Sequence, residues 1–313
     1  DDCSSRGLGD VYKRQSPFNS PSILSLIWHV ECQGVWRIAG GMYDLVKQIE
    51  TISKRSDASF FYKNKVKKIL MKNNKINGIE LKNNKIIDCD TIIFNGDPKA
   101  LFDGLLGDEI QNAVSNNNIN KRSLSAYVWS FAAKTQGLDL LHHNVLFNKN
   151  YKTEFDDIKR GEIPKDPTLY ICAQGSINNP RPKEKSLGRF EIIINGSPTY
   201  NHKKYNKQKE YTKCKEITFS ILDSMGLKMD LKPTEEMLTT PKEFEQLFPG
   251  SQGSLYGRTP HGISSTFMRP RNKSKIKGLL LAGGGTHPGA GIPMACLSGK
   301  HAAEMILKDL SLT

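Results

Sequence analysis

Apolar positions along the chain follow two periods, and each period predicts a different kind of element. Apolar side chains at helical spacing predict an amphipathic helix over Met42–Lys54 and a surface helix within Tyr200–Met225, in which Ile217, Ile221 and Met225 form the apolar face. Short apolar runs divided by Asn-Asn pairs predict a meander of strands joined by turns. The strands expected in this meander are Val66–Met71, Lys75–Leu81 and Lys85–Cys89.

Two further apolar runs have the uninterrupted character of buried parallel strands. Thr91–Phe94 runs into a turn at Asn95-Gly96-Asp97-Pro98, and Gly278–Ala282 runs through a glycine loop into a helix expected over Ile292–Leu310. Between these runs the chain alternates strands with helical or loop segments. The strands expected there are Ser125–Ala133, Thr168–Ala173 and Arg189–Ile194.

Composition narrows the classes of protein that fit this pattern. The 313 residues are 37% hydrophobic, which supports a folded core, and the net charge is +13. The basic residues are spread through Lys- and Asn-rich stretches rather than gathered in one stripe, and no nucleic-acid recognition motif is present, so we expect no nucleic-acid partner. The six cysteines are far apart, with no C-x-x-C, so neither a disulfide framework nor a metal site is expected.

The beginning of the chain suggests two segments outside the main pattern. Residues 1–15 lack an initiator Met and an apolar pattern, and we interpret them as a leader of adapter or vector origin. No run reaches the roughly 20 apolar residues of a membrane-spanning helix. The longest apolar segment, Ile23–Val30, contains Trp28, a residue type enriched at membrane interfaces, and is either a core helix or a peripheral membrane contact.

The segment with the strongest chemical signal is GLLLAGGGTHPGAGIPMACLSGK, from Gly278 onward. Here a buried strand passes through a run of glycines into a helix with Pro293 in its first turn. Glycines let a backbone approach a ligand closely, and the free N–H groups of a helix N-terminus favour electron-rich or anionic ligand atoms. The pattern therefore fits either a bound cofactor such as a flavin or a tight strand-to-helix turn without a ligand.

This segment resembles the C-terminal signature of the phytoene desaturase family of carotenoid desaturases. In that family a strand, a glycine-rich loop containing His-Pro-Gly and a long helix close over FAD. Residues placed near the ribityl and pyrophosphate part by the resemblance are Gly283, Gly284, Gly285 and His287. Residues placed beside the isoalloxazine ring are Gly289, Ala290, Gly291, Ile292 and Pro293.

The likeness extends from about residue 16 to residue 310. GVWRIAGGMYDLVKQIE is similar to the family segment whose Gly-Gly turn, here Gly40-Gly41, borders the flavin and the substrate tunnel. IIFNGDPKAL is similar to the segment that turns back into the FAD domain, and Val66 corresponds to a strand on the adenine side. The segments YVWSFAAKTQGLDLLHHNVLF, FDDIKRGEIPKDPTLYICAQG and GSLYGRTPHGISSTFMRPRNKSKIKGLLLAGG resemble the hydroxycarotenoid 3,4-desaturases in particular.

The resemblance implies an α/β fold. Its FAD/NAD(P)-binding Rossmann-like domain, of the glutathione-reductase type, would be incomplete, and a second α+β domain would bind substrate. We expect FAD-domain segments at 16–99 and 251–313 and the substrate domain at 100–250. The family opens with G-x-G-x-x-G, which this chain lacks, so we interpret the chain as a fragment truncated upstream that binds FAD weakly and is inactive alone.

The implied activity is FAD-dependent desaturation of a carotenoid polyene, with hydride passing to flavin N5. Weak candidates for substrate contact are Arg258 and His261, and we assign His287 no proton-transfer role. His142 and His143 are adjacent and on a strand would face opposite ways, which favours structural roles.

Three alternatives stay open: a phytoene desaturase, another FAD-dependent isoprenoid or amine oxidoreductase, and a non-enzymatic prenyl-binding protein of the same fold. The expected location is the cytoplasm, with peripheral association to the inner face of the membrane because carotenoids partition into lipid.

Overall fold

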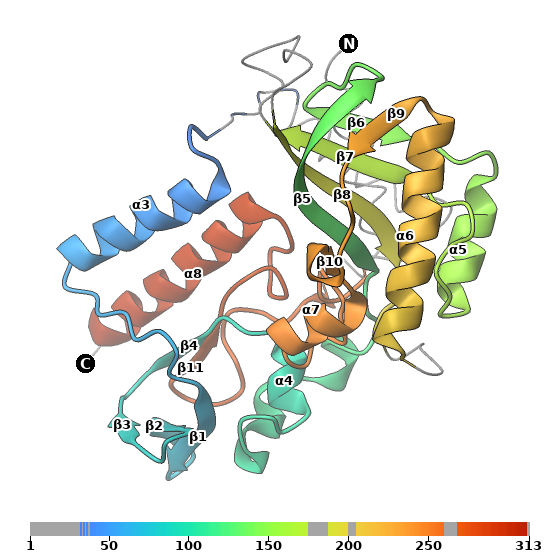
Figure 1. Ribbon diagram of the computed structural model, residues 1–313. Helices are drawn as coiled ribbons and strands as arrows, with labels where there is room; N and C mark the ends of the chain where they lie inside the picture. The colour runs from blue at the N-terminus through green and yellow to red at the C-terminus, as the bar shows by residue number, and fades with distance from the viewer. Residues whose placement is uncertain are drawn as a thin grey trace.

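A computed structural model describes residues 38–174, 187–199, 205–259 and 268–311, together with residues 32, 34 and 36. Its largest element is an antiparallel sheet of six strands in the order β10-β5-β8-β7-β6, with β9 paired to the far end of β5 (Figure 1). The strands are β5 Ser125–Gly137, β6 His143–Leu146, β7 Leu169–Gln174, β8 Gly188–Gly196, β9 Leu227–Asp230 and β10 Leu238–Thr239.

One face of this sheet carries the larger hydrophobic core. Alternate residues of β5, β7 and β8 point into it, and helix α6, Lys207–Ser224, covers it (Figure 1). Trp129 is fully buried there and donates from Nε1 to Thr218 Oγ1 at 3.1 Å. Ile217 and Ile221 pack against the core as the helical spacing predicts. The same prediction is wrong for Met225, which follows the last residue of α6 and is 44% exposed.

The predicted meander is present as a three-stranded antiparallel sheet. It consists of β1 Val66–Lys72, β2 Lys75–Leu81 and β3 Ile86–Asp88. Asn73, Asn74 and Asn84 have positive φ values between 52° and 63°, the conformation that Asn tolerates in tight turns.

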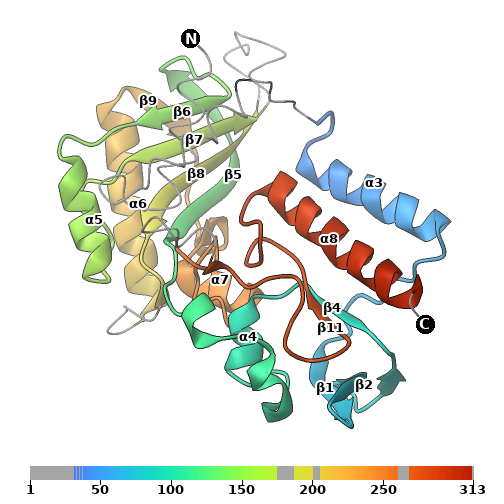
Figure 2. The same ribbon diagram turned by 180° about the vertical axis from the view of Figure 1, so that it is seen from behind.

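A parallel strand pair joins segments that are far apart in the chain. β4, Ile92–Phe94, pairs in parallel with β11, Leu279–Leu281, with Ile93 opposite Leu280. β11 is fully buried as expected, but the expectation for β4 is wrong in part, because Ile93 is 42% exposed. The predicted helices follow as α3, Met42–Arg55, and α8, Ile292–Ser311, which lie side by side in both Figures 1 and 2.

The fold is therefore α/β with two parts. The parallel pair, the meander, α3 and α8 form one part, which contains the segments expected to belong to the Rossmann-like domain. The six-stranded sheet with its helices is a second, α+β part. The remaining helices are α4 Pro98–Phe102, α5 Tyr151–Lys159 and α7 Pro241–Leu247, with 3-10 turns η3 Asp108–Ala113, η4 Asn116–Asn118 and η6 Glu235–Met237. The exact domain boundaries stay a prediction.

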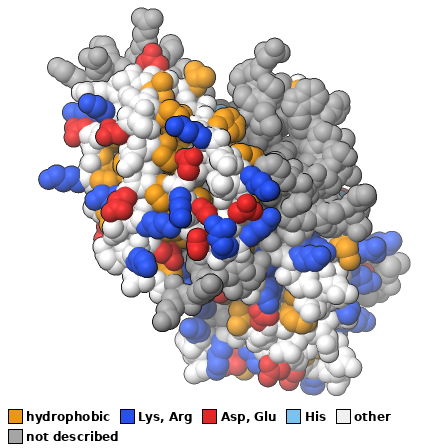
Figure 3. All heavy atoms as spheres, turned by 90° about the vertical axis from the view of Figure 1, so that its right-hand side faces the viewer, with side chains coloured by type: hydrophobic (Ala, Val, Ile, Leu, Met, Phe, Trp, Pro, Cys, Tyr) orange, Lys and Arg blue, Asp and Glu red, His pale blue; other side chains and the backbone are white. Residues whose placement is uncertain are grey.

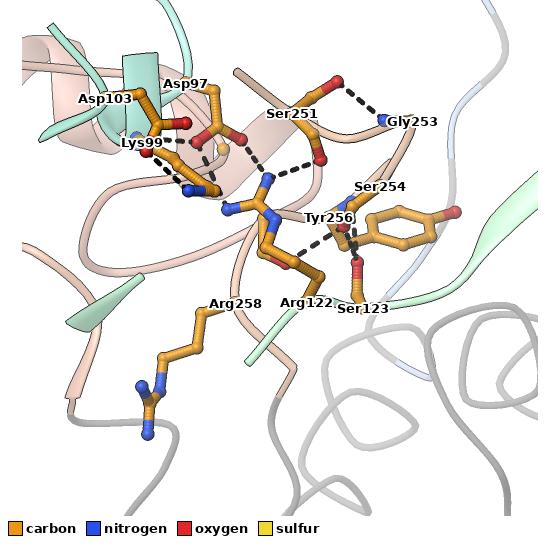
Figure 4. Close-up of polar contacts among 12 residues, drawn as sticks. Asp97, Lys99, Asp103, Arg122, Ser123, Ser251, Gly253, Ser254, Tyr256 and Arg258 are labelled. Carbon is orange, nitrogen blue, oxygen red and sulfur yellow. Dashed lines mark hydrogen bonds and ion pairs between the residues drawn. The ribbon is translucent and has the colours of Figure 1, made fainter. Parts of the chain in front are cut away.

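A buried ion pair lies where the two parts meet. Arg122 lies just before β5, and Asp97 follows β4. The two terminal guanidinium nitrogens of Arg122 donate to the two carboxylate oxygens of Asp97 (Figure 4). Its side chain is 1% exposed and that of Asp97 is 9% exposed. Arg122 also donates to the carbonyl of Ser251 at 3.0 Å, and Asp97 accepts from the backbone N–H of Lys99 at 2.9 Å as the N-cap of α4.

A second set of buried bonds continues this junction. The hydroxyls of Ser123 and Ser254 lie 2.6 Å apart, and Ser254 donates to the carbonyl of Gly257 at 3.0 Å (Figure 4). The backbone N–H of Ser123 donates to the same carbonyl at 2.9 Å. The 251–258 loop is therefore fixed against the start of β5 and, through Arg122, against the turn after β4. We name these contacts the Arg122 junction.

The charged side chains on the surface are mixed in sign, as the spread of basic residues along the sequence predicts. On the face shown in Figure 3, basic and acidic side chains are interspersed over the larger part of the molecule, as expected for a solvated surface. Among the helices built from described residues, none combines the length and the apolar character that crossing a bilayer demands.

The Arg122 junction predicts a large and specific stability effect. Asp97→Asn keeps a side chain that can cap α4 but leaves the Arg122 guanidinium buried without a counter-charge. We expect the free energy of unfolding to fall by about 3 kcal/mol. Urea unfolding followed by circular dichroism measures this change.

The matched control is Asp103→Asn on the same helix. It removes only a partly exposed ion pair with Lys99, whose Nζ lies 2.6 Å from Asp103 Oδ1, so we expect a loss of about 0.5 kcal/mol. Equal losses for the two variants would show that the buried pair does not hold the two parts together.

Candidate functional site

The glycine loop predicted from the sequence, Gly283–Gly291, connects β11 to α8 and is fixed at its start. The backbone N–H of Ala282 donates to the carbonyl of Phe94 in β4 at 3.0 Å. The N–H of Gly283 donates to the hydroxyl of Ser298 in α8 at 2.7 Å, and Ser298 donates to the carbonyl of Ala295 at 2.7 Å. The loop therefore begins at a fixed point between the strand pair and the helix.

The Arg122 junction supports one side of this loop by direct packing. Gly283 has φ 104°, and a Cβ there would lie 2.5 Å from Oδ1 of Asn95. A Cβ at Gly285 would lie 2.8 Å from Cδ of Pro98, and one at Gly257 would lie 3.1 Å from Cα of Gly285. The turn after β4 and the 251–258 loop thus leave no room for larger residues at these positions.

Two buried polar side chains support the loop from the 269–272 segment. Arg269 donates to the carbonyl of Gly284 at 2.8 Å and to that of Arg258 at 2.9 Å. Asn272 donates to the carbonyls of Leu281 and Ser298 at 2.9 and 2.8 Å, which ties β11 to α8. Neither residue was predicted from the sequence, because a basic run of this composition is typical of a solvated surface.

The loop leaves backbone open to a ligand. Gly283, Gly284, Gly285, His287 and Gly291 are partly exposed, Ile292 and Pro293 are exposed, and Gly289 and Ala290 are buried. A Cβ at Gly284 would meet nothing closer than Cα of Ala290 at 3.6 Å. Thr286 is fully buried, and its hydroxyl has no hydrogen-bond partner within the described residues. An accessible glycine backbone, an unpaired hydroxyl and the start of a long helix fit a flavin.

The start of α3 lies near the start of α8. The two helices run in the same direction, and both begin at the same end of the pair in Figures 1 and 2. Gly40 and Gly41 precede α3, are exposed and have φ values of 81° and 91°, and a Cβ at Gly41 would meet nothing within 4 Å. The fold thus brings the second predicted glycine segment to the end of α8 where the glycine loop enters. Val66 lies elsewhere, at the start of β1.

Of the two candidates for substrate contact, Arg258 and His261, the structure describes only Arg258. Arg258 is 6% exposed, and its guanidinium donates to the carbonyl of Asn117 and contacts Sδ of Met268 at 3.6 Å. Burial lowers the pKa of Arg258. These contacts indicate a structural role for Arg258 inside the protein. His261 lies outside the described residues.

Comparison with known proteins bears on this site. Residues 220–307, which include β11, the glycine loop and most of α8, match the family described as flavin containing amine oxidoreductase. This match implies FAD as the cofactor. It covers the loop that the sequence analysis selected, and with it Arg269, Asn272 and Ser298.

Curated relatives match nearly the whole chain. Hydroxyneurosporene desaturase of Cereibacter sphaeroides is 44% identical over 301 residues, and that of Rhodobacter capsulatus is 44% identical over 300 residues; each alignment covers 96% of this chain. A 1-hydroxycarotenoid 3,4-desaturase of a Flavobacterium species is 29% identical over 300 residues and 95% of this chain. The chain spans 59–60% of the length of these three proteins. It is a relative of the carotenoid desaturases.

Proposed function

We propose that this chain forms the greater part of an FAD-dependent oxidoreductase that desaturates a carotenoid, most specifically a 1-hydroxycarotenoid at its 3,4 position. The observation that carries the proposal is the open glycine loop between β11 and α8, inside the segment that matches flavin containing amine oxidoreductases. The relatives named hydroxyneurosporene desaturase, at 44% identity, support the hydroxylated substrate.

In this proposal the residues of the loop bind and orient the flavin. The partly exposed backbone of Gly283, Gly284 and Gly285 allows the flavin to approach closely. A hydrogen bond from Arg269 fixes the orientation of the Gly284 carbonyl. The exposed start of α8 favours electron-rich ligand atoms, because its first N–H groups have no partner within the helix. The chemistry that a bound flavin supplies is acceptance of a hydride at N5.

Removal of hydrogen next to a polyene requires little direct chemistry from protein side chains. Positive charge that develops at an allylic carbon is delocalised along the conjugated chain, so the protein's main tasks are positioning and exclusion of water. This requirement agrees with a site built from glycine backbone and buried structural arginines. A non-enzymatic prenyl-binding role would have no use for the open loop.

The contact of Gly284 with flavin can be tested without disturbing the fold. Gly284 has no positive φ, and an added Cβ meets only ordinary contacts, so a side chain there should be tolerated by the protein and not by the ligand. A chimera in which this chain replaces the matching part of the Cereibacter sphaeroides relative is the test protein. We expect Gly284→Leu to lower the flavin content of the purified chimera at least tenfold, measured by absorbance after denaturation.

The control is Gly299→Leu in α8, where an added Cβ would meet no described residue within 4 Å. This variant should retain flavin at the level of the unmodified chimera. Full flavin content in the Gly284→Leu protein would refute the assignment of this loop to the cofactor.

The substrate can be tested with the same chimera. Fed separately with 1-hydroxycarotenoid and with phytoene, it should extend the conjugated system of the hydroxylated substrate at least tenfold faster. Chromatography of the pigments and their absorption maxima measure this preference. Faster conversion of phytoene would identify the activity as that of a phytoene desaturase instead.

Peripheral contact with the inner face of a membrane is part of the proposal, because carotenoids partition into lipid. Support comes from the sequence, in the apolar Ile23–Val30 segment, which lies outside the described residues, and in the net charge of +13. We expect the chain to co-sediment with anionic vesicles and Ile27→Ser with Trp28→Ser to reduce that binding severalfold. Binding that is indifferent to anionic lipid and to both substitutions would place the contact on another surface.

A further inference from the structure

A cluster of metal-binding side chains lies on the six-stranded sheet, away from the glycine loop. One ring nitrogen each of His142 and His143 and the sulfur of Cys172 all lie within 4.8 Å of one another. Nε2 of His142 is 3.8 Å from Sγ of Cys172, and the two imidazole rings meet edge to face with centroids 4.4 Å apart. In Figures 1 and 2, β6 and β7 lie far from β4 and β11.

The strand register explains how these three residues meet. His143 of β6 is directly opposite Cys172 of β7, so the two side chains leave the sheet on the same face. His142 precedes β6, so the alternation of side chains along a strand does not apply to it. The prediction that the two histidines face opposite ways is therefore wrong. The face that they share is opposite to the one on which Ile171 and Ala173 enter the core.

The backbone around the cluster is fixed. The carbonyl of His142 accepts from the N–H of Ala173 at 2.9 Å. The side chain of Asn144 accepts from the N–H of Leu141 at 2.9 Å and donates to the Leu141 carbonyl at 2.7 Å and to that of Ile171 at 3.2 Å. These bonds hold the turn that carries both histidines against β7, so the three side chains start from fixed positions.

One histidine also has an orienting partner. Nδ1 of His143 lies 2.6 Å from the hydroxyl of Tyr170, two residues before Cys172 on the same face of β7. Metal-bound histidines commonly make such a bond through the other ring nitrogen, which fixes the ring and its tautomer. In a metal site that keeps this contact, the metal would bind the other ring nitrogen, Nε2.

We propose that His142, His143 and Cys172 bind a divalent transition metal ion, with zinc the best match, and that a water molecule completes a four-coordinate site. Two imidazoles and one thiolate are a ligand set that zinc favours. Tetrahedral zinc holds its nitrogen and sulfur ligands about 3.3–3.6 Å apart, so the 3.8 Å between His142 and Cys172 is already close to bonding geometry. A tilt of the exposed His143 ring that keeps its contact with Tyr170 would supply the remaining approach.

Cys172 differs from the other described cysteines in its neighbours, because it alone among those cysteines lies in a group of three metal-binding side chains. Burial raises the pKa of the Cys214 thiol to about 12, and that residue lies in the hydrophobic core. Cys89 and Cys296 belong to no group of three metal-binding side chains among the described residues. Cys172 is also buried, but it lies directly opposite His143, whose side chain is exposed. Binding would displace the Cys172 proton to solvent as the thiolate bonds to the metal.

The experiment is a titration of the purified chain, freed of metal by a chelator, with Co²⁺ as a spectroscopic substitute for zinc. We expect one ion per chain and a thiolate-to-cobalt charge-transfer band that zinc abolishes. Cys172→Ser should remove the band, and His143→Ala should weaken binding at least tenfold. Tyr170→Phe should weaken it about tenfold by freeing the His143 ring.

Controls separate metal binding from folding and from other thiols. Cys89→Ser should leave the titration unchanged, and His143→Ala, at an exposed position, should leave the circular dichroism spectrum unchanged. Absence of a charge-transfer band in the unmodified chain, or its persistence in Cys172→Ser, would overturn the proposal. None of these readouts depends on flavin or on carotenoid, so failure here leaves the proposed activity untouched, and the reverse also holds.

Discussion

The buried ion pair between Arg122 and Asp97 is the contact on which the glycine loop depends. Asp97 ends the turn after β4 and caps α4, while Arg122 leads into β5 and also bonds the Ser251 carbonyl. Three segments distant in the chain are thereby fixed at one place. Charges this deeply buried are costly to desolvate, and the bonds from the two terminal nitrogens of Arg122 to Asp97 and to the Ser251 carbonyl offset that cost. The Nε of Arg122 has no hydrogen-bond partner among the described residues. Because Pro98 and Gly257 both pack on Gly285, the geometry of the junction passes directly to the loop.

The support of the loop by the 269–272 segment is equally polar. Arg269 and Asn272 donate to backbone carbonyls of the loop, of β11 and of α8, and both side chains are nearly inaccessible. A loop rich in glycine has high conformational entropy when free, so holding it in one shape takes many fixed contacts. The buried arginines and the asparagine provide these contacts with charge-assisted or amide hydrogen bonds. The exposed part of the loop can then present backbone to a ligand without a side chain of its own.

The sequence predicts the elements better than it predicts these contacts. The helices α3 and α8 and the β1–β3 meander follow from local signals: apolar spacing, Asn turns and Pro293 in a first turn. The parallel pairing of β4 with β11 joins residues more than 180 positions apart, which no local pattern specifies. Arg122 stands in a basic stretch typical of a solvated surface, so its burial is a property of the assembled fold. The predicted opposite orientation of His142 and His143 was wrong for a different reason. The alternation of side chains along a strand was applied to His142, which precedes the strand.

The glycines of the loop separate into two kinds, and the distinction bears on what the site is for. Gly283 and Gly285 are required by neighbours within the protein, since a Cβ at either would collide with Asn95 or Pro98. Packing alone therefore accounts for them, and a turn without a ligand would contain them too. Among the described residues, Gly284 and Gly41 have no such neighbour, and Gly284 has no unusual φ that would call for glycine. A residue without a side chain at an open, partly exposed position is best explained by something that approaches from outside. Gly284 is thus the glycine that packing among the described residues leaves unexplained and that the proposed flavin contact would explain.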